Sequence, residues 1–483
     1  MEVMSYRKNI NKIFLSFIFH ALFSFLFVFF SYYFLKPKDF SYLTGLFIFE
    51  GLLIFFDLTI YNYVIKHLSI LKKYHDRQKL ISFFFVRLLI FSLLFFLLNL
   101  TFIRIFYWDR ILINEISIFY GINLSYFVTL IVSFIVIFRI LINYLRIILI
   151  GSFQQELFSN IQVVSSIIKI LTLFLFINNS KSIESILIAY LLGLIIEFLI
   201  FFKFSNKIIK FKFNLKKKYL KFPNYLFIFA ISNIFFFNVD RIFISYYLIP
   251  DEIGKYNFFR VMLSFFFILS ISYYYNLFPD ISRINSVKKI IKNKIYINFK
   301  SLNIILIFIL LNIILFSENY FIDFKINNFL EVGNINILKI LAIAMYFNII
   351  GIILYSFQVG IFFFKIPSLI NIFLIFISIP FFLVLYKPDD STNVAYIYLF
   401  LNICWFFFNL FFLNKNFKKI FSRDILIFFL KNFFINFTVI LIILLFLYFL
   451  IYNLSKILFY LLIFFCFLFC VTISQRILNK YVY

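Results

Sequence analysis

The sequence predicts an all-α membrane protein that crosses the bilayer about fourteen times, and three observations favour this fold class. Hydrophobic residues make up 64% of the 483 residues, whereas soluble domains contain about 45–50%, so a water-soluble fold could not bury this much apolar surface. The apolar residues form runs of about 20, which is the length of a membrane-spanning helix. The polar breaks between these runs alternate in charge along the chain.

Short polar breaks divide the chain into fourteen apolar runs, and each run is predicted to be one transmembrane helix. The ninth and eleventh runs are short, so twelve spans is the alternative count. The predicted spans are 13–35, 41–65, 80–103, 117–138, 157–177, 185–202, 224–248, 256–280, 301–317, 335–357, 369–386, 393–413, 432–451 and 457–474.

The net charge of +26 is interpreted as an orientation signal. If the N-terminus is cytoplasmic, the loops on that side contain 32 Lys and Arg residues, and the opposite loops contain 9. Cytoplasmic loops of membrane proteins carry such an excess. We therefore expect a multi-pass protein of the plasma (inner) membrane with both termini in the cytoplasm, and no nucleic-acid partner.

One eight-residue pattern occurs twice, at 33–40 and at 246–253, and reads Tyr-x-Leu-x-Pro-x-acid-apolar in both copies. Proline suits the first position of a helix, and an acidic side chain in the first turn complements the helix dipole. The copies join spans 1 and 2 and spans 7 and 8. They predict two six-helix lobes in a parallel pseudo-repeat, followed by two additional C-terminal helices.

The predicted domain boundaries follow from this repeat. The N-terminal lobe covers 1–202, a basic cytoplasmic linker with eight lysines covers 203–223, the C-terminal lobe covers 224–413, and the two additional helices cover 414–483. The longest external loop has 17 residues, so we expect the substrate to be handled within the membrane or at its edge.

The region around spans 7 and 8 carries a family resemblance. Residues 238–248 read Asn-Val-Asp-Arg-Ile-Phe-Ile-Ser-Tyr-Tyr-Leu, and Ile-Gly-Lys-Tyr (253–256) and Phe-Pro-Asp-Ile-Ser (278–282) follow. These segments resemble polysaccharide flippases, a branch of the multidrug/oligosaccharidyl-lipid/polysaccharide (MOP) exporter superfamily. The first lobe is similar at 35–40 and 56–58, although Ser and Thr stand at 41 and 59, where glycine is common in the family.

The resemblance implies a MATE-like (MOP) fold and a transporter. Such proteins move undecaprenyl-pyrophosphate-linked oligosaccharide repeat units from the cytoplasmic to the outer leaflet by alternating access, for surface polysaccharides such as O-antigen or capsule. The implied partners are this lipid-linked oligosaccharide, membrane lipid, and the polymerase and chain-length machinery of the same pathway. The resemblance implies no enzymatic activity and no cofactor.

Two competing functions stay open from the sequence. A drug or cation antiporter of the same superfamily would use unpaired intramembrane carboxylates. A polysaccharide polymerase or glycosyltransferase would usually carry a long external loop or a catalytic acid motif. The sequence contains neither a Gly-x4-Gly-Lys-Ser/Thr phosphate loop nor a His-Glu-x-x-His motif, so no catalytic residue and no metal ligand is predicted.

Ionisable residues inside a membrane are functional candidates by default, because a charge at the bilayer centre costs roughly 2.5–3.5 kcal/mol on insertion scales. In span 2, Glu50 and Asp57 are seven residues apart and therefore share a helix face. Arg87 in span 3 is predicted at a depth similar to that of Asp57. We expect an ion pair between Asp57 and Arg87, with Glu50 and Asp57 in a gating role.

A second group of candidates lies in spans 7 and 8. Asp240 can pair with Arg241 or with Arg260, which leaves one arginine without a counter-charge. A guanidinium offers a rigid set of donors that matches phosphate oxygens. We therefore predict that Arg241 or Arg260, together with Arg87, contacts the lipid pyrophosphate.

The remaining intramembrane candidates are single residues. His20 in span 1 is expected to hydrogen-bond to a neighbouring helix or to relay protons. Lys169, Glu197 and Lys339 lie near predicted span ends, where long side chains reach toward the membrane surface. These three are expected to be solvated in that way.

Overall fold

A computed structural model describes the chain over thirteen ranges and two single positions, and every structural statement below concerns these residues. They are 2–35, 40, 43, 55–71, 73–106, 122–178, 182–210, 224–247, 250–283, 288–323, 332–361, 363–385, 391–416, 424–450 and 456–480. Glu50 lies outside them. Asp57 lies in a described helix, but its side chain is not among the side chains described.

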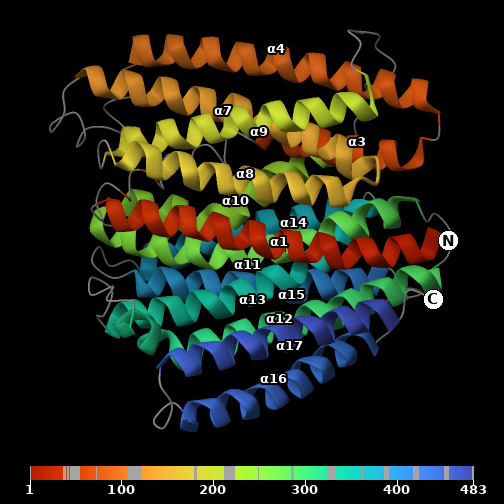
Figure 1. Cartoon of the computed structure of the whole chain (residues 1–483), viewed down its shortest axis with the longest axis vertical. Helices are drawn as coiled ribbons and strands as arrows, with labels where there is room; N and C mark the ends of the chain where they lie inside the picture. Colours follow the sequence, from red (N-terminus) through yellow and green to blue (C-terminus); the bar gives the residue numbers. More distant parts are fainter. Residues whose placement is uncertain are drawn as a thin grey trace. The chain divides into compact units, whose positions relative to one another are not determined.

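The described residues form fourteen long α-helices and no strand (Figure 1). Each helix overlaps one of the fourteen predicted spans, and most extend beyond it because the helix continues into the polar flanks. The helices are α1 (Glu2–Phe34), α3 (Phe55–Ile70), α4 (Tyr74–Phe106), α7 (Ile122–Gly151), α8 (Gln155–Ile177), α9 (Ile183–Ile208), α10 (Asn224–Tyr247), α11 (Pro250–Arg283), α12 (Lys288–Asp323), α13 (Val332–Gly360), α14 (Lys365–Leu385), α15 (Thr392–Asn416), α16 (Asp424–Leu450) and α17 (Lys456–Lys480).

The helices have the length and composition of membrane spans. Among the described residues, nine segments are apolar and long enough to cross a bilayer, with mean hydropathies of 1.8–2.5. Large apolar side chains remain exposed along α4, α14 and α16, as expected for helices that face lipid. The all-α, polytopic fold class is therefore confirmed, and the chain is a multi-pass membrane protein.

The chain divides into two compact units. The first unit comprises 16–235, and the second comprises 1–15 and 236–483. In the first unit, α8 and α7 pack against α9, and α3 and α4 pack against α7. Buried tyrosine hydroxyls on these helices donate hydrogen bonds to backbone carbonyls of neighbouring helices: Tyr61 to Ile140 O at 2.9 Å and Tyr144 to Ile81 O at 2.7 Å.

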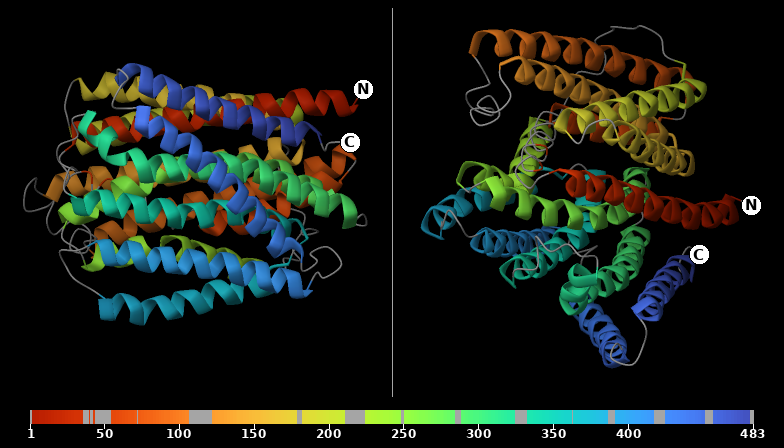
Figure 2. Two further views of the ribbon diagram at one scale, coloured as in Figure 1. Left: turned by 90° about the horizontal axis from the view of Figure 1, so that it is seen from below. Right: turned by 60° about the vertical axis from the view of Figure 1, so that its left-hand side comes forward.

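In the second unit, α13 is central and packs against α11, α12 and α15, while α14 packs against α15. The C-terminal helices α16 and α17 pack against α12 (Figure 2). Gly351 on α13 lies against the Trp405 ring of α15, and the Trp405 indole donates a hydrogen bond to Asn371 Oδ1 on α14 at 2.9 Å. Pro250 is the first residue of α11, as the repeated pattern predicts for its second copy.

The fourth predicted span was too short. It was expected to end at residue 138, but α7 continues to Gly151, and the segment Leu130–Gly151 is itself apolar enough to span a membrane. Arg139 and Arg146, expected in a cytoplasmic loop, lie within this segment. The reason is that two charges among otherwise apolar residues do not end a helix when neighbouring helices supply their partners.

Candidate functional site

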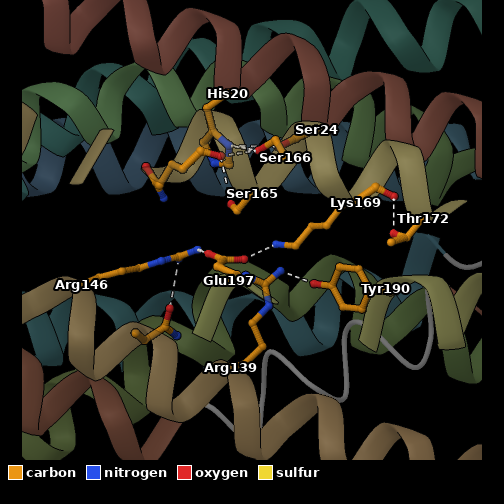
Figure 3. Close-up of polar contacts among 12 residues, drawn as sticks. His20, Ser24, Arg139, Arg146, Ser165, Ser166, Lys169, Thr172, Tyr190 and Glu197 are labelled. Carbon is orange, nitrogen blue, oxygen red and sulfur yellow. Dashed lines mark hydrogen bonds and ion pairs between the residues drawn. The ribbon is translucent and has the colours of Figure 1, made fainter. Parts of the chain in front are cut away.

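A cluster of charged side chains lies inside the first unit, between helices α1, α7, α8 and α9 (Figure 3). At its centre is Glu197, near the middle of α9, whose side chain has an exposed fraction of 0%. Its Oε1 accepts from Arg146 Nη2 on α7, and its Oε2 accepts from Lys169 Nζ on α8. One carboxylate thus links three helices through two cations.

One face of α9 contacts the charged side chains that reach the cluster from α7 and α8. Tyr190, Gly193, Glu197 and Phe201 recur at helical spacings of three and four, so they lie on the same face. The Tyr190 hydroxyl accepts from Arg139 Nη2, and the ring lies 5.7 Å from Lys169 Nζ. Further along, the Arg146 guanidinium lies 5.6 Å from the centre of the Phe201 ring.

Gly193 allows α8 and α9 to approach closely at this level. A Cβ atom added at Gly193 would lie 2.5 Å from Lys169 Cγ and 3.3 Å from Lys169 Cα. The Lys169 stem therefore passes directly over the glycine on its way to Glu197. Beside it, Thr172 Oγ1 lies 3.0 Å from Ala189 O, which places a second polar contact at the same helix crossing.

His20 belongs to the edge of this cluster. Its Nδ1 lies within hydrogen-bond distance of Ser166 Oγ, which joins α1 to α8. The Ser166 hydroxyl also lies 2.8 Å from Gln162 O, to which it can donate. Ser166 Oγ can then accept a hydrogen bond from His20 Nδ1. This contact is the hydrogen bond to a neighbouring helix that the sequence suggested for His20.

Positive charge exceeds negative charge in this cluster. Among the described side chains, Arg146 and Lys169 share the single carboxylate of Glu197, and Arg139 lies beside them. Hydrophobic residues of similar size would often stabilise a buried site as well as an ion pair does. Charges kept in an apolar helical unit are therefore candidates for a functional role, and the sign of the excess suits an anionic ligand.

A second polar cluster lies within the second unit and resolves the alternatives for Asp240. Asp240 pairs with Arg260, whose Nε lies 3.0 Å from Oδ2, and Tyr256 donates to the same oxygen at 2.9 Å. The other Arg260 nitrogens contact Met345 Sδ at 2.9 Å, Phe237 O at 3.2 Å, and the Tyr398 hydroxyl. Arg260 thus joins α10, α11, α13 and α15.

Arg241, the other candidate partner of Asp240, is placed differently. Its Nε is buried and has no hydrogen-bond partner among the described residues. Asp240 Oδ1 is likewise buried without a described partner. Of the two arginines in this unit, Arg260 is engaged by protein groups at each of its nitrogens, whereas Arg241 keeps a donor available.

Arg87 makes its described contact with an aromatic ring. Its guanidinium carbon lies 4.0 Å from the centre of the Phe83 ring, one turn earlier on α4. Its predicted partner Asp57 lies on α3, with a side chain outside the described residues, so the Asp57–Arg87 pair stays a prediction. Arg87 belongs to the first unit, and Arg241 and Arg260 belong to the second.

The centre of the cluster differs from what the sequence predicts. Lys169 and Glu197 were expected to reach the membrane surface, and this was wrong, because they are buried and pair with each other. Lys339 is more exposed than Lys169 and Glu197, and its Nζ lies 3.0 Å from Glu318 Oε1. Arg139 and Arg146 carried a readable signal: two arginines seven residues apart in an apolar stretch share a helix face.

Comparison of the fold with solved structures identifies the class of protein. The chain is similar to a multidrug resistance MATE family transporter of the MOP superfamily in its outward-facing conformation, with 13% identity, a TM-score of 0.66 and coverage of 86% of this chain and 96% of that one. The chain is also similar to a MATE transporter of Vibrio cholerae, with 10% identity, a TM-score of 0.62 and coverage of 86% of this chain and 98% of that one. The lipid II flippase MurJ in an inward closed conformation is similar as well, with 17% identity, a TM-score of 0.58 and coverage of 97% of this chain and 98% of that one. The fold is thus MATE-like.

The family is shown by the sequence itself. Residues 6–285 match the family described as polysaccharide biosynthesis protein, and the chain belongs to that family. None of the curated proteins matches the chain. The resemblance read from spans 7 and 8 is therefore confirmed, and family and fold together support flipping or transport of a lipid-linked substrate.

Proposed function

We propose that the protein translocates undecaprenyl-pyrophosphate-linked oligosaccharide repeat units from the cytoplasmic to the outer leaflet of the inner membrane, for surface polysaccharide such as O-antigen or capsule. The family match supports a role in polysaccharide biosynthesis, and the MATE-like fold supports transport. The mechanism we propose is alternating access. The protein acts without a cofactor and without forming or breaking covalent bonds.

The observation that carries this proposal is the excess of cations around Glu197. A diphosphate has several charged oxygens, and Arg and Lys are the side chains that bind phosphate in proteins. Arg146 and Lys169 place a guanidinium and an ammonium at one point inside an apolar unit. We propose that they attract the diphosphate of the lipid carrier, while the prenyl chain stays in the bilayer.

We propose roles for the predicted residues that agree with their surroundings. Arg241, with its available Nε, and Arg87 contact the diphosphate at other stages of transport. Arg260 and Asp240 hold the second unit together, and Asp57, Glu50 and His20 contribute to gating. The proposed domains remain 1–202, 203–223, 224–413 and 414–483, with both termini cytoplasmic. Partners are membrane lipid and the polymerase and chain-length machinery.

Deletion of the gene, followed by analysis of lipid-linked sugars on each membrane face, tests the proposal. Complete undecaprenyl-pyrophosphate oligosaccharide should accumulate on the cytoplasmic side, and surface polysaccharide should be lost. Single repeat units displayed outside but never joined would indicate a polymerase instead. An unchanged glycan profile with altered drug or cation tolerance would indicate an antiporter.

A further inference from the structure

Glu197 resembles a bound phosphate group in its contacts. Two oxygens on one carbon each bind a different cation, Arg146 on one side and Lys169 on the other. A phosphate group placed between an arginine and a lysine would offer its oxygens in the same way. The carboxylate therefore occupies the position in which these two cations would hold a phosphate.

Exposure differs between the carboxylate and its cations. The Glu197 side chain is 0% exposed, whereas 14% of the Arg146 side chain and 11% of the Lys169 side chain remain exposed. Part of each cation's side chain is therefore accessible, whereas the carboxylate is not. Because like charges repel, Glu197 itself is not a contact for an anionic ligand.

The two cations are suited to an exchange of partners. Arg146 is held in place by Asn143 Oδ1, 3.1 Å from its Nη1, while its buried Nε has no hydrogen-bond partner among the described residues. Lys169 has a flexible stem and three rotatable donors, so it can turn from one acceptor to another. The Arg146 guanidinium is thus held in position and keeps its Nε–H as a further donor, whereas the Lys169 ammonium can reorient.

We propose that Glu197 is an internal counter-anion, which neutralises the two cations until a phosphate of the substrate displaces it. The inference rests on the proposed function and adds how binding and release at that site are balanced. Displacement makes binding an exchange of one anion for another. Return of the carboxylate then releases the diphosphate, so a site with strong cations does not retain its substrate.

The test uses the purified full chain and inorganic pyrophosphate as the probe. Glu197→Gln removes the charge while it keeps the shape, and it should bind pyrophosphate at least about tenfold more tightly than the wild type, because close buried charge pairs couple by at least that factor. Export in cells should fall, since release is slower. Titration calorimetry measures the affinity.

Glu318→Gln is the matched control. Its carboxylate also accepts from a lysine, Lys339 at 3.0 Å, but its side chain is 61% exposed. This variant should bind pyrophosphate as the wild type does. If Glu197→Gln does not yield folded protein, Glu197→Asp keeps the charge but shortens the reach to both cations, and it should bind more tightly than the wild type by a smaller factor.

Unchanged or weaker pyrophosphate binding by the Glu197 variants would overturn the inference, as would reduced export without any gain in affinity. Absence of pyrophosphate binding by the wild type would overturn it as well. None of these results would affect the proposed function if the deletion strain still accumulates lipid-linked oligosaccharide on the cytoplasmic side. Failure of that accumulation would instead contradict the proposed function itself.

Discussion

At the scale of single residues, the contact between Lys169 and Glu197 depends on the absence of a side chain at Gly193. Its missing side chain lets the Lys169 stem cross α9 and reach Glu197. The spacing of Tyr190, Gly193 and Glu197 on one helix face is visible in the sequence, but the partner that crosses this face is not. Only the packed structure shows that Lys169 fills the space.

Gly193→Ala should therefore destabilise the protein by about 1–3 kcal/mol, the usual cost of overpacking. The added methyl group would lie 2.5 Å from Lys169 Cγ, so the lysine must move away from Glu197. Thermal unfolding of the purified protein in detergent measures the effect. In a Lys169→Ala background the 2.5 Å contact with Cγ is removed, so the cost should be smaller, and the same cost in both backgrounds would contradict this explanation.

Arg260 and Arg241 should differ in what their removal does. Arg260→Ala leaves buried Asp240 without its cation and should cost about 3–5 kcal/mol. Arg241→Ala should cost much less, because its Nε has no described hydrogen bond to lose, yet it should reduce export. Unfolding midpoints and surface polysaccharide measure the two effects. Equal losses of stability would refute the distinction.

At the scale of helices, the hydropathy pattern predicted the number and approximate positions of the described helices. Each of the fourteen apolar runs overlaps a helix among the described residues, and Pro250 begins α11 as its pattern indicates. The error at α7 arose because Arg139 and Arg146 were counted as loop residues. Whether a charge ends a span depends on partners from other helices, and sequence spacing alone does not supply them.

The candidate site was predictable only where its partners lie on adjacent spans. Asp240 and Arg260 come from neighbouring helices, so the sequence could name their pairing as one of two alternatives. Glu197 meets Lys169 and Arg146, which lie 28 and 51 residues away. No local periodicity relates these three positions, so their contact follows from how α7, α8 and α9 pack.

Helix α17 is attached to the second unit by buried hydroxyl groups. The Tyr273 hydroxyl on α11 lies 2.8 Å from Ser301 Oγ on α12 and 3.3 Å from Ser474 Oγ on α17. The two serine hydroxyls also hydrogen-bond to each other. Hydrogen bonds between helices in a membrane are worth about 0.6 kcal/mol on average and up to about 1.7. This group therefore contributes modestly but specifically to the position of α17.

Ser474→Ala should lower the free energy of unfolding by about 1 kcal/mol, because two buried hydroxyls lose a shared partner. Thr472→Val is the control on the same helix, since its hydroxyl is bonded to Phe469 O within α17 at 2.8 Å and is exposed. Denaturant titration compares the two. An equal effect of both substitutions would show that α17 does not depend on this contact.

At the scale of the whole molecule, the fold separates two kinds of surface. Apolar side chains on α4, α14 and α16 are exposed where lipid is expected, while the Glu197 cluster and the Asp240–Arg260 pair each lie buried within one unit. A transporter for a lipid-linked sugar needs both surfaces, because the prenyl chain and the charged diphosphate require different surroundings. The distribution of charge therefore agrees with the family and with the fold.

The central claim is that cations inside the first unit hold the diphosphate of a lipid-linked sugar during translocation. The most direct measurement is flipping in proteoliposomes, with a short-chain polyprenyl-diphosphate oligosaccharide whose sugar is detected by a lectin outside the vesicle. The account predicts that Arg146→Gln with Lys169→Gln lowers the flipping rate at least about tenfold, while a sugar-free phospholipid probe is unaffected. Wild-type flipping by a folded double variant would contradict the account.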